Sequence, residues 1–262
     1  MSSLQSPFLS RPAGRSLLMM AGLLLTVSAC AASSSLLVGV ADQPTPFTAT
    51  ASLPAEAIEP SPSSLPSATV QRQPVAVFLG DSYTSGWEGV GSGANSWATI
   101  VTNTLGGRMV NLAVPGTGFV RGGIHGGTEG DRVGRQLSAA IAAAPDIVFL
   151  AAGFNDTPYP RSRVLAAARD VVLRLRAALP TARIVIIGPW WPGPDATPPA
   201  TLLALRDQLH ADAIRIGALF IDPYAEGWFS GENRQLIGAD QLHPTTRGYR
   251  TIAQRVLLAM EE

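Results

Sequence analysis

The sequence predicts an α/β domain in which a five-stranded parallel sheet lies between two layers of helices. From residue 75 onward, five short runs rich in Val, Ile, Leu or Phe alternate with longer amphipathic stretches. The short runs are apolar throughout, as expected of strands buried on both faces. A regular alternation of strands and helices favours right-handed crossovers, which build a parallel sheet covered on both sides.

The predicted strands, in chain order, are Val75–Leu79, Met109–Ala113, Ile147–Ala151, Ile184–Ile187 and Leu219–Ile221. The predicted helices between and after them are Ser96–Leu105, Arg132–Ala143, Arg163–Ala178, Pro199–Ile216 and Thr246–Met260. The third and last helices carry Arg on one side and Leu, Val or Ala on the other, a spacing typical of surface helices. Pro180 ends the third helix, because proline cannot continue it.

The N-terminus has the pattern of an export signal. Arg11 and Arg15 precede the apolar segment Ser16–Ala29, which has the length of a signal-peptide core and is shorter than the roughly 20 residues of a membrane-spanning helix. It ends in "VSAC", so that Cys30, the single cysteine, follows small residues. This ending resembles the bacterial lipobox, whose cysteine is lipidated and becomes the mature N-terminus. The alternative is an ordinary signal peptide cleaved near Ala29 or Ala32.

The segment 31–74 is rich in Ala, Ser, Thr and Pro, and Phe47 is its one aromatic residue. Such a segment buries too little apolar surface to offset the entropy of ordering. We therefore expect a signal peptide over 1–30, a flexible tether over 31–74 and a folded domain over 75–262. On this interpretation the domain is exported and anchored by lipid to the outer face of the cytoplasmic membrane or the cell envelope, or else secreted.

The composition argues against nucleic-acid binding and against one class of metalloenzyme. The formal net charge is zero, so nothing points to a nucleic acid. Metallophosphoesterases also place "GD" and "ND" turns after strands, but they need several His and Asp ligands around two metals. With three histidines, the chain is poor in such ligands, and we expect no two-metal site of this kind. The oligomeric state does not follow from the sequence.

Polar residues follow the predicted strands, where parallel sheets bind their ligands. These segments are "GDS", "VPGTG", "GFND" and "GPWWPG", with "DQLHP" before the last helix. Ester hydrolysis needs a nucleophile, a base, a group that orients the base, and donors for an oxyanion. Ser82 is the candidate nucleophile, His243 the base and Asp240 the orienting group. The Asn155 amide and the Gly116 backbone N–H are candidate oxyanion donors.

Each motif alone also fits a structural role. Gly, Asp and Ser are common turn residues, and a single histidine often caps a helix or fills a pocket. Among the three histidines, however, His125 lies in a glycine-rich segment and His210 in a predicted helix. His243 alone follows a predicted strand and has an acidic residue nearby.

Five further residues are candidates for supporting roles. Asp81 and Asp156 flank Ser82 and Asn155, and we expect them to brace the loops by accepting backbone hydrogen bonds. Three tryptophans, Trp87, Trp190 and Trp191, follow strands of the predicted sheet. Tryptophans there stack on sugar rings or line an acyl pocket, or they are half-buried core aromatics.

Four segments, in order, resemble the four blocks of the SGNH hydrolases, a branch of the GDSL esterase/lipase family: "GDSYTSG", "NLAVPGTG", "GFND" and "DQLHP". The resemblance covers Val75–Met260. It implies a flavodoxin-like three-layer α/β/α sandwich and no metal or organic cofactor. It places the family's serine, glycine, asparagine and histidine on Ser82, Gly116, Asn155 and His243, and its aspartate on Asp240. Pro115 departs from the pattern, because many relatives have a small polar residue before the glycine.

The resemblance implies a serine esterase or lipase whose substrate is a small-molecule or polymer-borne acyl ester. A Ser82–His243–Asp240 triad would form a serine ester, and the oxyanion would be held by the N–H groups of Ser82 and Gly116 and by Asn155. Two alternatives stay open. The same residues serve acyl transfer to a sugar, and the fold also suits a non-catalytic module that binds envelope glycan or lipid.

Overall fold

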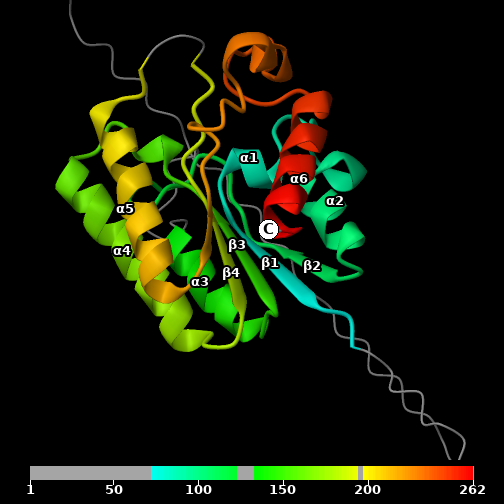
Figure 1. Cartoon of the computed structure of the whole chain (residues 1–262), viewed down its shortest axis with the longest axis vertical. Helices are drawn as coiled ribbons and strands as arrows, with labels where there is room; N and C mark the ends of the chain where they lie inside the picture. Colours follow the sequence, from blue (N-terminus) through cyan, green and yellow to red (C-terminus); the bar gives the residue numbers. More distant parts are fainter. Residues whose placement is uncertain (1–71, 123–132, 194–196, 262) are drawn as a thin grey trace, which may run out of the picture. The chain divides into compact units, whose positions relative to one another are not determined.

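The centre of the domain in the computed structural model is a five-stranded sheet (Figure 1). Its strands are β1 (Val75–Gly80), β2 (Arg108–Asn111), β3 (Ile147–Ala151), β4 (Arg183–Ile187) and β5 (Leu219–Ile221). Their order is β2-β1-β3-β4-β5, and all neighbours are parallel. This order is that of flavodoxin-like folds and confirms the predicted fold class. The structure describes residues 72–122, 133–193 and 197–261.

The helices are α1 (Ser82–Ser85), α2 (Trp97–Thr104), α3 (Val133–Ala142), α4 (Arg161–Ala178), α5 (Ala200–Ile216) and α6 (Thr246–Glu261). Short 3₁₀ segments are η1 (Gly93–Asn95), η3 (Phe154–Asp156) and η4 (Gly231–Leu236). The predicted α2 began one residue early because Ser96 is its N-cap, whose hydroxyl accepts the Ala98 N–H. The sequence analysis missed α1, since four residues are too few to show helical periodicity.

Two layers of helices cover the sheet, one on each face. Alternate side chains of a strand point to opposite faces, and β1 divides in this way. Val77 and Leu79 pack in one cluster with α3, α4 and α5. Ala76 and Phe78 pack in the other with α1, α2 and α6. Figure 1 shows the same division, with α3–α5 on one side of the strands and α1, α2 and α6 on the other.

The direction of the crossovers changes between β1 and β3. From β1 the chain passes through α2 to β2 at one edge, and then through α3 to β3 on the other side of β1. Helices on opposite faces thus leave a crevice at the carboxyl ends of β1 and β3, the usual ligand site of such sheets. Ser82 follows β1 there and Asn155 follows β3.

The start of the domain is tied to the sheet at Asp146. Its carboxylate accepts the Val75 N–H at 2.7 Å and pairs with Arg72 at 2.6 Å. These hydrogen bonds hold the pKa of Asp146 below its ordinary value. The predicted signal peptide, Cys30 and the tether up to residue 71 lie outside the described residues and stay predictions. None of the helices that the structure describes is long and apolar enough to cross a membrane.

Candidate active site

Ser82 lies where β1 turns directly into α1. Asp81 caps this helix, and its carboxylate accepts the Tyr83 N–H at 3.0 Å. A glycine is needed just before it, because a β-carbon at Gly80 would collide with the Ala151 carbonyl of β3. Ser82 is 6% exposed, so its hydroxyl stands at the crevice largely shielded from water.

His243 lies between Ser82 and Asp240. Its Nε2 is 2.9 Å from the Ser82 Oγ, and its Nδ1 is 2.7 Å from the Asp240 Oδ2. If Nδ1 carries the proton that Asp240 accepts, Nε2 has a lone pair for the Ser82 hydroxyl. The structure thus brings together the three side chains that the sequence analysis selected.

The loop itself holds Asp240 in place. Its Oδ1 accepts the backbone N–H groups of Leu242 and His243, both at 3.0 Å. Burial acts to raise the pKa of Asp240, but the hydrogen bonds from the His243 ring and these two N–H groups lower it below its ordinary value. Asp240 is therefore ionised over the neutral pH range, as an orienting carboxylate must be.

Two tyrosines that the sequence analysis missed support these residues. The Tyr83 hydroxyl donates to the Leu242 carbonyl, one residue before His243. The Tyr249 hydroxyl of α6 donates to the Ser82 carbonyl at 3.4 Å. Tyr83 directly follows the candidate nucleophile in "GDSY", but nothing in that spacing shows that it reaches a loop 159 residues away.

Gly116 occupies the third position of a tight turn. The Thr117 N–H donates to the Val114 carbonyl at 3.2 Å, and Gly116 has φ of 74°. Proline at the second position and a positive φ at the third define a type II turn. Pro115, which departs from the pattern of many relatives, therefore favours the very turn that Gly116 needs. The turn is tied to β1 by the Thr117 hydroxyl, which donates to the Gly80 carbonyl at 3.0 Å.

Asn155 connects this turn to Asp81. Its Nδ2 donates to the Thr117 carbonyl at 2.9 Å and to the Asp81 Oδ2 at 3.3 Å. Burial, with a further contribution from the charge of Asp156, raises the pKa of Asp81 to about 7. Asp81 thus braces both α1 and Asn155.

Asp156 holds the loop that follows the turn. Its carboxylate accepts three successive backbone N–H groups, those of Phe119 at 2.6 Å, Val120 at 3.0 Å and Arg121 at 2.9 Å. Burial raises the pKa of Asp156 despite these donors. The contacts are those expected of a brace. Gln136 of α3, which the sequence analysis missed, binds both the N–H and the carbonyl of Gly80.

A cavity of about 200 Å³ opens onto these groups. Ser82, Gly116, Asn155 and His243 all line it, together with Asp81, Tyr83, Trp87, Arg121, Phe154 and Leu242. The candidate nucleophile, base and oxyanion donors therefore line the same cavity. A separate cavity of about 430 Å³ is lined in part by Trp191 and Tyr224.

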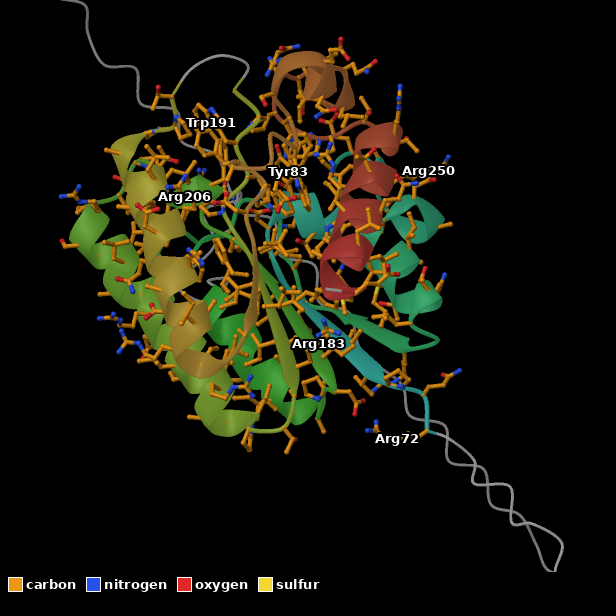
Figure 2. All side chains as sticks on the ribbon, viewed as in Figure 1. Arg72, Tyr83, Arg183, Trp191, Arg206 and Arg250 are labelled. Carbon is orange, nitrogen blue, oxygen red and sulfur yellow. The ribbon has the colours of Figure 1, made fainter. Side chains whose placement is uncertain are left out.

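The three tryptophans have different positions. Trp87 is half-buried, lines the smaller cavity and stacks on His243. Trp191 lies near Phe154, with ring centroids 6.3 Å apart, and Figure 2 shows it at the same end of the sheet as Tyr83. Trp190 is fully buried and stacks on Tyr83 at 5.2 Å. The prediction of a substrate contact is wrong for Trp190, because its fully buried ring leaves no surface for a ligand.

Among the described residues, no group of three or more His, Cys, Asp or Glu side chains gathers as around a metal ion.

Comparisons with known proteins find matches over most of the folded domain. The model of the GDSL-like lipase/acylhydrolase family matches residues 78–251. A GDSL lipase of Mycobacterium tuberculosis is 36% identical over 196 residues, which cover 72% of this chain and 82% of that protein.

Two solved structures are similar in fold. The lipase/acylhydrolase from Enterococcus faecalis has a TM-score of 0.56 at 18% identity and covers 72% of this chain and 96% of its own. Axe2, an acetylxylan esterase from Geobacillus stearothermophilus, has a TM-score of 0.54 at 21% identity, with coverages of 73% and 95%.

Proposed function

This chain belongs to the GDSL-like lipase/acylhydrolase family, and from that premise we propose that it hydrolyses carboxylic acyl esters with Ser82 as nucleophile. Membership in this family confirms the resemblance found in the four sequence blocks. The activity of the family is of the esterase or lipase type. The observation that carries the proposal is the continuous hydrogen-bonded path from the Ser82 Oγ through the His243 ring to the Asp240 carboxylate.

In the first half of the reaction, the Ser82 Oγ attacks the carbonyl carbon while the His243 Nε2 takes the hydroxyl proton. Asp240 stabilises the imidazolium that forms, through the proton on Nδ1. His243 then gives its proton to the leaving alcohol, and a serine ester remains. In the second half, His243 deprotonates a water molecule, which attacks the ester, and the protonated ring then returns the proton to Ser82.

The oxyanion is held by the backbone N–H groups of Ser82 and Gly116 and by the Asn155 amide. Within the described residues, neither backbone N–H has a hydrogen-bond acceptor, so both are open to a ligand. Asn155 would exchange its longer bond, the 3.3 Å one to Asp81, for the oxyanion. A carboxyl with a pKa of about 7 is partly neutral at neutral pH and is then a weaker acceptor, which makes that exchange easier.

The proposed place of action is outside the cytoplasmic membrane, by way of the export signal and lipidation at Cys30. The proposed substrate is an acyl ester, carried by a small molecule or by an extracellular polymer. The names of the relatives, a lipase and an acetylxylan esterase, support both lipid and acetylated-sugar esters as candidates.

The test is hydrolysis of p-nitrophenyl esters from acetate to longer acyl chains by wild type and Ser82→Ala. We expect nitrophenol release that disappears in the variant. Ser85→Ala is the matched control, since Ser85 lies in the same short helix and its hydroxyl contacts only the Gly86 carbonyl among the described groups. A folded wild type that turns over none of these esters would contradict the proposal.

A further inference from the structure

We propose that Trp87 is a positioning residue for His243, whose indole keeps the imidazole aligned between Ser82 and Asp240 and stabilises the imidazolium formed during the reaction. The inference rests on the proposed function, because it takes His243 as the catalytic base. It gives Trp87 a role that acts through His243 rather than through the substrate.

The two rings are stacked face to face. Their centroids lie 4.5 Å apart and their planes differ by 12°. Tyr83 lies at 5.9 Å from the imidazole with a tilt of 43°. The face of an aromatic ring attracts a cation, and most strongly when water is excluded. Because His243 is only 7% exposed, the indole replaces part of the solvation that the imidazolium would otherwise receive from water.

Trp87 is held by a hairpin with a two-residue turn. The Trp87 N–H donates to the Val90 carbonyl at 3.0 Å, and the Val90 N–H donates to the Trp87 carbonyl at 2.7 Å. The two residues of the turn, Glu88 and Gly89, have φ of 47° and 78°, as a type I′ turn requires. Glu88 is a non-glycine residue in the left-handed region, which costs conformational energy.

Gly91, which follows the hairpin turn, packs against α6, the helix that comes after His243. Gly91 has φ of 69° and lies so close to Tyr249 of α6 that a β-carbon would overlap the phenol ring. Tyr249 in turn contacts the Ser82 carbonyl. The hairpin that carries the indole is thus braced against the same helix residue that supports Ser82, so the stacking distance is set by the core rather than by a free loop.

Trp87 also lines the cavity, so a direct contact with substrate is the competing explanation. The two roles differ in their kinetic effect. A positioning residue that favours the imidazolium lowers kcat when it is lost, whereas a residue that binds substrate in both ground and transition states raises KM when it is lost.

The experiment compares Trp87→Leu and Trp87→Phe with wild type on p-nitrophenyl acetate over a range of pH. We expect Trp87→Leu to lower kcat about 2- to 30-fold with little change in KM, and Trp87→Phe to recover most of the loss. Val90→Ala is the control, because it truncates an exposed side chain in the same hairpin and keeps the backbone pairing.

The pH profile supplies a readout that a purely structural role would not move. Without the indole the imidazolium is less stable, so the acid limb of kcat/KM should move to lower pH in Trp87→Leu. Among the described residues, the other titratable or charged groups that line a cavity with His243 or contact its ring are Asp240, Asp81, Tyr83, Arg121 and Glu88, and none of them is changed. An unmoved limb with wild-type kcat, or a change in KM alone, would overturn the proposal.

A measurement without turnover separates this inference from the proposed function. In protein labelled at histidine, the indole ring current should shift the His243 ring protons upfield in the NMR spectrum, and Trp87→Leu should abolish the shift. Its absence in wild type would overturn the stacking even if the enzyme is active. If wild type hydrolyses no ester, the proposed function fails, whereas the shift still shows whether Trp87 holds the ring.

Discussion

Gly118 lies so close to the Asp156 carboxylate that a β-carbon at this position would overlap both carboxyl oxygens. Asp156 comes from η3 after β3, and Gly118 directly follows the turn at Gly116. Their close approach lets one carboxylate accept three successive N–H groups and hold the loop that carries Gly116. The relationship explains why this segment needs a second glycine.

Replacing Gly118 by alanine should therefore impair the oxyanion site. We expect Gly118→Ala to displace Asp156 or the loop, with a loss of about 1–3 kcal/mol in the free energy of unfolding from disturbed buried hydrogen bonds and a lower kcat. Urea unfolding and ester turnover measure both effects. Gly134→Ala is the control: Gly134 lies inside α3, its β-carbon would meet only Val171 at 3.5 Å, and alanine there should stabilise the helix. Equal stability of both variants would contradict the close approach.

Asp81→Asn should change how stability depends on pH. Burial raises the folded-state pKa of Asp81 to about 7, well above the ordinary value of an aspartate, so folding favours the neutral carboxyl. The loss of stability that comes from ionising this buried carboxyl is absent below about pH 4 and grows as pH rises toward 7. The variant removes this penalty, so its stability relative to wild type should increase between pH 4 and 7, by at most on the order of 4 kcal/mol.

Asp240→Asn is the comparison for that experiment, because the pKa of Asp240 is shifted the opposite way. A lowered folded-state pKa contributes stability above the unfolded value and loses it only as pH falls through the folded value. The ionisation of the Asp240 carboxyl itself should therefore add no pH dependence between pH 5 and 8, and Asp240→Asn should lack the large rise expected for Asp81→Asn. Urea unfolding at several pH values gives both curves, and parallel curves for the two variants would refute the assignment for Asp81.

In activity, the same Asp240→Asn variant should keep the fold and lose most of the rate. An asparagine amide facing Nδ1 favours the tautomer with the proton on Nε2, so His243 cannot accept the Ser82 proton. The loss for a serine triad of this kind is about 10⁴-fold in kcat. Steady-state turnover of p-nitrophenyl acetate measures it, with circular dichroism to verify the fold. Wild-type turnover would mean that another group orients His243.

Asn155→Ala should lower kcat by about 10²- to 10³-fold while KM changes little, as for the loss of one oxyanion donor. Steady-state kinetics with p-nitrophenyl acetate measures the two parameters separately. Asn95→Ala is the matched control, since the Asn95 side chain bonds Arg250 at the surface. A loss in the control as large as in Asn155→Ala would indicate a general effect on folding.

Much of the site could be predicted because its residues follow strand ends. Ser82 and Asn155 lie in short motifs that come soon after the buried strands β1 and β3, and His243 lies in a motif just before α6. What was missed makes contacts between segments far apart in sequence. Gln136 reaches Gly80 across 56 residues, and Tyr83 reaches Leu242 across 159. No periodicity or spacing records such contacts.

The sequence by itself determined the order of strands and helices, the parallel sheet and the family of the site. These features depend on the secondary-structure preferences of short segments and on the pattern of apolar residues, and both can be read from the sequence alone. Only the tertiary structure decided which of the tryptophans is buried, that Trp87 stacks on His243, and how Asp81 and Asp156 divide the bracing of the loops. Those outcomes depend on which surfaces meet when the layers pack, and packing is a property of the whole fold rather than of any one segment.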